Sequence, residues 1–168
     1  MEILSYTASF TSTVLGLFEP FCKKMKNVLV LNFIGNVLVG LSYFCVSKYS
    51  GAAICMVAAI QLLINYSFTV RGKKVPLALM AVHAAVFLAV NIVTFKAWYD
   101  VLALMAALLF VLSVAQHTPK YYRIIYIANS LLWIVYDLLA AAYGNLVTHT
   151  VLSAAIALAI WLRDMKQK

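Results

Sequence analysis

The chain has 168 residues, of which 65% are hydrophobic and 11% charged, and it carries a formal net charge of +8. Soluble domains contain about 25% charged residues, so this composition excludes an ordinary soluble domain and indicates an integral membrane protein. In such a chain an excess of Lys and Arg is typical of cytoplasmic loops, and we expect no nucleic-acid binding.

Apolar stretches separated by short polar or basic segments predict seven transmembrane helices, since a spanning helix needs roughly 20 mostly apolar residues. Pro20 lies near the end of the first stretch and Pro76 near the start of the fourth, two positions where a helix tolerates proline. The predicted fold class is an all-α membrane protein, one transmembrane domain over residues 1–168, with spans at residues 3–21, 28–46, 52–70, 75–95, 97–114, 121–142 and 146–162.

The basic residues divide the predicted loops into two sets. One side of the membrane receives only Lys48 and Lys96. The other side receives eleven basic residues, which are Lys23, Lys24, Lys26, Arg71, Lys73, Lys74, Lys120, Arg123, Arg163, Lys166 and Lys168. By the positive-inside rule the basic side is cytoplasmic, so we expect the N-terminus outside and the C-terminus in the cytoplasm. Merging or dropping one span would mix the two sets, so the charges favour seven spans.

A repeated pattern relates the second and sixth spans. Asn36, Tyr43 and Gly51 each recur, without a gap, as the same residue type 93 positions later. This pattern predicts a duplication, with repeat 1 over about residues 1–70, a linker helix over about 75–95 and repeat 2 over about 97–164. Two parallel three-helix repeats are the arrangement of SWEET-type carriers, whose substrate lies at the repeat interface near the bilayer midplane. Chance coincidence is the alternative.

The stretch over residues 127–146 is apolar and long enough to cross a bilayer, but it carries polar residues on one helical face. Asn129, Trp133, Tyr136 and Asp137 share this face at positions i, i+4, i+7 and i+8. We expect Asp137 more than a turn from either end. A charge there costs at least about 2.5–3.5 kcal/mol in lipid, so it should face protein or a water-filled cavity. The alternative is an acid near the outer mouth that reaches water.

Several other polar residues are candidates to line a pathway. Gln61 and Asn65 form a narrow polar stripe on the third span, and His83 and His149 are candidate partners of Asp137. Each has an alternative role in holding helices together or in core packing. The predicted substrate-binding residues are Asn36, Tyr43, Gln61, Asn65, Asn129, Trp133, Tyr136, Asp137 and His149.

The sequence contains no recognisable motif for catalysis, phosphate binding or metal binding. Cys22, Cys45 and Cys55 lack CxxC or His-rich spacing, so they predict neither a disulfide framework nor a metal site. HExxH, GxSxG, P-loop and GxGxxG patterns are absent. We therefore expect no enzymatic activity, no cofactor and no metal. The expected partners are the lipid bilayer and a small polar solute, and a homo-oligomer is compatible with the sequence.

The pattern of Trp133, Tyr136 and Gly144, followed by a span that ends at Arg163, resembles the bacterial YgjV-type inner-membrane protein family over nearly the whole chain. The resemblance implies a bacterial inner-membrane location. The chain is also similar to three-plus-one-plus-three carriers, including SWEET sugar carriers and PnuC-type vitamin carriers, in which Asn and Trp residues contact the solute. Asn36, Asn129 and Trp133 match those residue types. The SWEET Pro-Gln pair and a PnuC signature are missing, so no substrate is carried over.

Two functions follow as hypotheses. The first is a carrier of a small polar solute, such as a sugar, nucleoside or vitamin-like compound, that works by alternating access between the two repeats. The second is a non-transporting receptor, scaffold or assembly subunit on the same fold. A solvated pocket bounded by both repeats would favour the first. A dry interior, with Asn36 and Asn129 bonded only to neighbouring helices, would favour the second.

Overall fold

The computed structural model describes residues 1–165, so the predicted loop positions of Lys166 and Lys168 lie outside the described residues. Seven α-helices account for most of this part of the chain. They are α1 (Glu2–Phe18), α2 (Met25–Cys45), α3 (Tyr49–Val70), α4 (Leu77–Thr94), α5 (Asp100–Val114), α6 (Pro119–Leu139) and α7 (Tyr143–Ala159). A short 3-10 turn, η1 (Glu19–Phe21), follows α1, and a π-helical segment, η2 (Ile160–Met165), continues α7.

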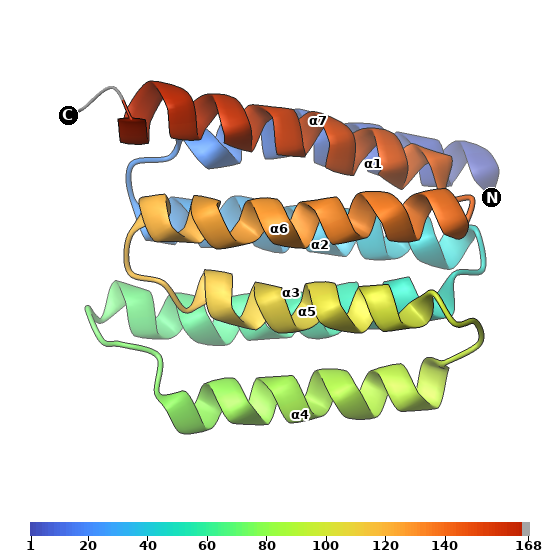
Figure 1. Cartoon of the computed structure of the whole chain (residues 1–168), viewed down its shortest axis with the longest axis horizontal. Coiled ribbons are helices and arrows are strands. Elements are labelled where there is room, and N and C mark those ends of the chain that lie inside the picture. The colour runs from blue at the N-terminus through green and yellow to red at the C-terminus, as the bar shows by residue number, and fades with distance from the viewer. Residues whose placement is uncertain (166–168) are drawn as a thin grey trace.

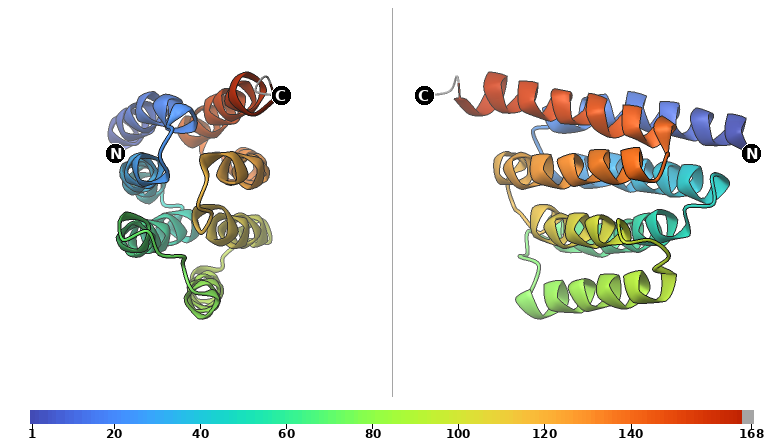
Figure 2. Two further views of the ribbon diagram at one scale, coloured as in Figure 1. Left: turned by 90° about the vertical axis from the view of Figure 1, so that its left-hand side faces the viewer. Right: turned by 45° about the vertical axis from the view of Figure 1, so that its right-hand side comes forward.

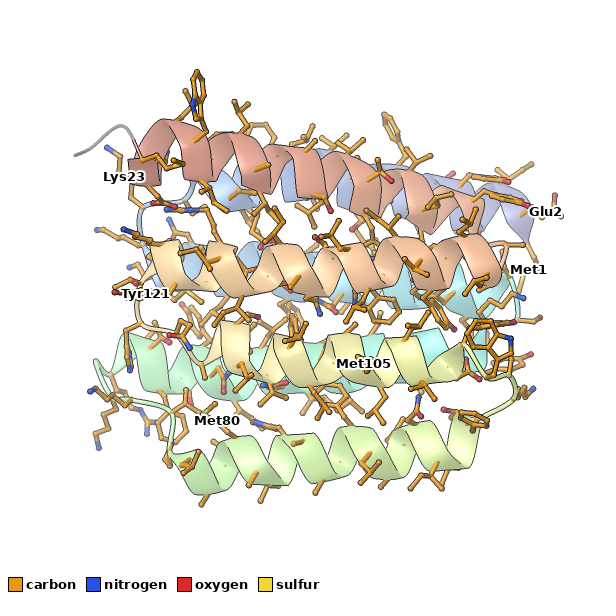
Figure 3. All side chains as sticks on the ribbon, viewed as in Figure 1. Met1, Glu2, Lys23, Met80, Met105 and Tyr121 are labelled. Atoms are coloured by element: carbon orange, nitrogen blue, oxygen red, sulfur yellow. The ribbon has the colours of Figure 1, made fainter. Side chains whose placement is uncertain are left out.

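The helix axes are roughly aligned with one another, and the helices form two rows (Figures 1 and 2). One row holds α1, α2 and α3, and the facing row holds α7, α6 and α5, while α4 packs against α3 and α5 at one side. The start of α1 and the end of η2 lie at opposite ends of the bundle (Figure 1). We call these the N-terminal end, with Met1 and Glu2, and the C-terminal end, with Lys23 and Tyr121 (Figure 3).

Five of the described segments are long and apolar enough to cross a membrane, which are α2, α3, α4, α6 and α7 together with η2. The helix α5 is apolar but has only 15 residues, and α1 has 17. Large apolar side chains are exposed on the outer faces of the bundle, as expected for contact with lipid. The seven predicted helices are therefore present, and five of them meet the length and composition of a span.

The stretch over residues 127–146 is not one helix, contrary to the expectation that it could span the bilayer by itself. The helix α6 ends at Leu139, where Ala141 adopts the left-handed backbone conformation with φ of 54°. The backbone N–H of Ala142 then closes the turn on the carbonyl of Asp137, at 2.9 Å. Asp137 therefore lies in the last turn of α6, and its expected position more than a turn from the helix end is wrong.

A turn of the same kind ends α2, which lies in the facing row. Ser47 has φ of 59°, and the N–H of Lys48 donates to the carbonyl of Tyr43 at 2.9 Å. In this geometry Tyr43 occupies the place that Asp137 occupies in α6, although the two positions differ by 94 residues and not by 93. The bounds of the paired helices agree with this, because Pro119–Leu139 follows Met25–Cys45 by 94 residues at both ends.

Burial follows the 94-residue relation as well. Each of the seven buried residues of α7 lies 94 positions after a buried residue of α3, which are Gly51, Ile54, Cys55, Ala58, Gln61, Leu62 and Asn65. Helix bounds and burial thus agree at a spacing of 94 residues, one more than the spacing predicted from Asn36 with Asn129 and from Gly51 with Gly144. One residue turns a helical position by about 100°, so the two spacings pair different side chains.

Candidate functional site

A small cavity lies between the two rows of helices. About 40 Å³ of it is open to the centres of water molecules, which is room for a few waters. Every helix of the bundle contributes to its wall. The side chains with hydrogen-bonding groups that line it include Ser12, Thr13, Glu19, Asn32, Asn36, Tyr126, Asn129, Trp133, Thr148 and His149. Of the predicted site residues, Asn36, Asn129, Trp133 and His149 therefore meet at one cavity.

At the C-terminal end of this cavity, three buried polar residues form what we call the Glu19 cluster: Glu19, Asn32 and Tyr122. Tyr122 donates its phenol hydrogen to the Glu19 carboxyl group, and Asn32 donates to the same carboxyl oxygen at 3.0 Å. Asn32 Nδ2 also lies 2.6 Å from the Tyr122 oxygen. The ring of Tyr126 stacks on Tyr122 at 4.8 Å. Since η1 and α6 belong to facing rows, these bonds hold the two rows together.

At the N-terminal end, Asp137, Tyr43, His149 and Trp133 form what we call the Asp137 cluster. Tyr43 donates its phenol hydrogen to one oxygen of Asp137, and His149 Nδ1 lies 2.6 Å from the other oxygen. Trp133 stacks on the His149 ring at 5.5 Å and packs against Tyr43 at 5.7 Å. Asp137 and Tyr43 are both completely buried. This cluster also joins the two rows, because Tyr43 comes from α2 and the other residues from α6 and α7.

The two asparagines of the cavity wall are bonded to protein in different ways. Asn36 is half-buried and donates to the carbonyl and side-chain oxygens of Asn32, within its own helix, at 2.9 and 2.6 Å. Asn129 is buried and donates to the carbonyl of Ala106 on α5, at 2.6 Å. The Asn129 amide therefore also ties α6 to α5.

Five of the nine predicted site residues do not line the central cavity. Two of them, Tyr43 and Asp137, belong to the Asp137 cluster, and the other three are Tyr136, Asn65 and Gln61. Tyr136 lies behind the Asp137 cluster, where its hydroxyl approaches Gly51 and its ring packs against Tyr99 at 5.8 Å. Asn65 donates to the carbonyl of Val114 on α5, at 3.2 Å. Gln61 is buried on the same helix, and its side-chain nitrogen and oxygen have no hydrogen-bond partner within residues 1–165. The structure therefore brings four of the nine predicted site residues to the central cavity and leaves these three apart from it.

The sequence reasoning missed the Glu19 cluster and the polar face of α1. Glu19 directly precedes Pro20, at the end of the first predicted span. A signal was present, since Ser5, Ser9 and Ser12 precede it at helical spacing and are all buried. Along this face Ser9 donates to Asn145 on α7, at 2.7 Å, and Thr13 donates to Thr148, at 2.9 Å. The polar stripe of α1 thus faces protein and leads along the bundle to Glu19.

The arrangement can bind a small polar group but offers no cluster of metal ligands. Within residues 1–165, no group of three His, Cys, Asp or Glu residues is placed to hold a metal ion. The predicted partnership of Asp137 with His149 is confirmed, whereas His83 lies on α4 without a hydrogen-bond partner among the described residues. Amides, hydroxyls and an imidazole line the cavity, and they offer both donors and acceptors to a solute.

Comparison with known proteins gives one positive result. No curated protein and no solved structure matches the chain. A model of a protein family described as bacterial inner membrane protein matches residues 3–167. Because this match covers nearly the whole chain, and because the apolar helices agree with it, the protein is a member of the Imp-YgjV family of bacterial inner membrane proteins.

Proposed function

We propose that the protein carries a small polar solute across the inner membrane by alternating access at the central cavity. The observation that supports this most strongly is the position of the two clusters. The cavity lies between the two rows, and at each end a buried carboxyl group accepts a hydrogen bond from a tyrosine of the opposite row. Opening one cluster at a time would expose the cavity to one side of the membrane at a time.

We also propose that the two rows are parallel repeats of three helices joined by α4, as in SWEET-type carriers. The 94-residue relation of helix bounds and burial supports this. In this register α1, α2 and α3 correspond to α5, α6 and α7, so the symmetry axis runs along the bundle between α2 and α6. A rocking motion of the repeats about a second axis, perpendicular to this one and in the plane of the membrane, would separate the rows at one end and keep them together at the other.

The size of the cavity favours a closed state for the structure. With about 40 Å³ open to water centres, the cavity admits a few waters but no sugar or nucleoside. Binding of such a solute would require the rows to move apart. The polar bonds at the two ends are suited to this, since hydrogen bonds can be exchanged for bonds to water when an end opens.

We propose that the C-terminal end of the bundle faces the cytoplasm. Nine of the basic residues within 1–165 belong to this end, against only Lys48 and Lys96 at the other. In this orientation the Glu19 cluster closes the cytoplasmic side and the Asp137 cluster the outer side. Reporter domains fused to the two termini would test the orientation independently of transport.

Cys55 provides a direct test of alternating access, because it is buried and lines the cavity. A protein with Cys22→Ser and Cys45→Ser keeps this thiol alone. We expect a small membrane-impermeant thiol reagent to label Cys55 from either side, in vesicles of opposite orientation, and solutes from a panel of sugars, nucleosides and vitamins to slow the labelling.

The matched control has Cys22→Ser and Cys55→Ser and keeps Cys45, which is buried at the end of α2 and does not line the cavity. We expect its labelling to be unaffected by any solute of the panel. If the reagent labels Cys55 from only one side, or from neither, the result contradicts alternating access.

A second function, a non-transporting receptor or scaffold, is favoured by one observation. Asn36 and Asn129, the two amides expected to meet the solute, both donate to protein carbonyls in the structure. A scaffold would keep these bonds permanently. The Cys55 experiment separates the two proposals, because a scaffold with a permanently closed interior would leave Cys55 unlabelled from either side.

A further inference from the structure

A second and larger cavity lies at the C-terminal end of the bundle, apart from the central one. Its volume is about 420 Å³, which falls in the range of roughly 300–1,000 Å³ typical of small-ligand sites. It is formed where the loop after η1, the start of α6 and the segment η2 come together. The lining residues are Cys22, Lys23, Thr118, Pro119, Lys120, Arg123, Arg163 and Asp164.

The charges of this basic cavity are unbalanced. Four of its lining residues are cationic and one, Asp164, is acidic. The acid is already engaged, because Arg123 donates to both of its carboxylate oxygens, at 2.9 and 2.5 Å. Among residues 1–165, no ion pair joins Lys23, Lys120 or Arg163 to an acid. Three positive charges therefore remain around one hollow, which favours an anionic ligand.

Part of the wall of this cavity is fixed in place. Arg123 is buried, and its third bond, at 3.0 Å, goes to the carbonyl of Pro20. The guanidinium group of Arg163 lies over the ring of Phe21, at 5.8 Å. These contacts hold cations from α6 and η2 against η1, so the site is partly ordered without a ligand. A preorganised site loses less conformational entropy when an anion binds.

The surroundings of the basic cavity indicate its depth in the membrane. Large apolar and aromatic side chains next to its lining residues are exposed, including Phe18, Tyr121 and Trp161. Exposed Trp and Tyr at helix ends are typical of the boundary between acyl chains and headgroups. Basic pockets between helices at this depth bind the headgroups of anionic lipids.

We propose that the basic cavity binds the phosphate headgroup of an anionic phospholipid, with Lys23, Lys120 and Arg163 as the residues that contact the phosphate. The acyl chains would lie along the exposed apolar faces beside Tyr121 and Trp161. This site is separate from the central cavity, and its occupation does not depend on whether the protein transports a solute.

The test measures lipid binding to the purified full chain. Detergent-solubilised protein is titrated with phosphatidylglycerol and with phosphatidylcholine, and bound lipid is counted by native mass spectrometry. The test variant is Lys23→Gln, Lys120→Gln, Arg163→Gln. At about 1 kcal/mol per basic residue near an anionic surface, loss of three charges should lower the affinity for phosphatidylglycerol more than tenfold and leave phosphatidylcholine binding unchanged.

The matched control is Arg71→Gln, Lys73→Gln, Lys74→Gln, which removes the same charge from the same end of the bundle. These residues lie between α3 and α4, are exposed and do not line the basic cavity. We expect this control to keep its affinity for phosphatidylglycerol within about twofold, a loss well below the one expected from the basic cavity. An equal loss in both variants would mean general surface attraction and would overturn the proposal.

Two further arms separate charge from packing and a lipid from a free anion. A charge-conserving variant, Lys23→Arg, Lys120→Arg, Arg163→Lys, should bind phosphatidylglycerol as the unmodified protein does, and loss of binding here would assign the effect to packing and overturn the proposal. Inorganic phosphate, added at the lipid concentration, should not displace the lipid. Displacement by phosphate would mean that the site takes a free anion, and it would overturn the assignment to a lipid.

Discussion

The Asp137 cluster and the Glu19 cluster use the same bond, a phenol hydrogen donated to a buried carboxyl group across the two rows, but their surroundings differ. Asp137 is fully enclosed, with an imidazole on its second oxygen and aromatic rings around it. Glu19 lines the cavity itself, and its second partner is the amide of Asn32.

The difference indicates how easily each end can open. Water in the cavity can replace a partner of Glu19, whereas Asp137 has no such access within the described residues. A polar group without a hydrogen-bond partner lowers the stability of the fold strongly where water cannot reach it, and only weakly where water can. We therefore expect the Glu19 cluster to be the end that opens with the smaller loss of stability.

The largest effect should come from breaking the Asp137 cluster. Asp137→Ala leaves the Tyr43 hydroxyl and the His149 ring without their partner in a dry site, and we expect it to lower the free energy of unfolding by about 3–5 kcal/mol. Thermal unfolding in detergent would measure this. Glu2→Ala provides a control that removes an exposed carboxylate from the first turn of α1. A cost for Asp137→Ala no larger than that of the control would contradict the enclosure of Asp137.

Breaking the Glu19 cluster should cost less. Glu19→Ala frees Asn32 and Tyr122, but the shortened side chain enlarges the cavity and admits water to both. We expect a loss of about 1–3 kcal/mol in the free energy of unfolding, measured under the same conditions. The isosteric Glu19→Gln keeps an oxygen for the tyrosine and should cost less again. If Glu19→Ala lowers the free energy of unfolding as much as Asp137→Ala or more, the Glu19 cluster is not the end that opens with the smaller loss of stability.

The smallest loss of stability should come from removing the hydroxyl groups of the two tyrosines. Tyr43→Phe and Tyr122→Phe each remove one hydroxyl, with an expected cost of about 0.5–1.5 kcal/mol, and Tyr43→Phe should be the more costly of the two. Double-mutant cycles with Asp137→Asn and Glu19→Gln would isolate the two couplings. A coupling energy near zero at either end would mean that the corresponding tyrosine does not hold the rows together. Tyr6→Phe, on the exposed face of α1, controls for loss of a hydroxyl.

The number of helices and the set of basic loops could be read from the sequence, because apolar length and charge are local properties. The ends of the helices were harder to predict from the sequence. Asp100 accepts bonds from the backbone N–H groups of Lys96 and Ala97, at 2.8 and 3.0 Å, so α5 begins three residues later than expected. The end of α6 depends on Ala141, which adopts the left-handed backbone conformation. The residue type alanine does not predict this conformation.

The site was only partly predictable, since a polar face shows that a residue avoids lipid without showing which neighbour it meets. Asn65 and Asn129 both donate to carbonyls of α5, but only Asn129 lines the cavity. The spacing of the proposed repeat is a similar case. Matching residue types suggested 93, whereas the buried faces of α3 and α7 correspond at 94. Burial is a property of the fold and constrains the register more strongly than a few identities do.

The bond between Tyr43 and Asp137 has a consequence for the ancestry of the chain. Under the proposed duplication these two residues occupy equivalent places, one in each repeat, and they touch across the symmetry axis. In an ancestral homodimer both places would hold the same amino acid. Two aspartates would repel each other there, and two tyrosines would lack a carboxyl acceptor. Under this proposal, an acid–phenol pair at this point can evolve only after the two copies are encoded separately, so a gene duplication would have preceded this interaction.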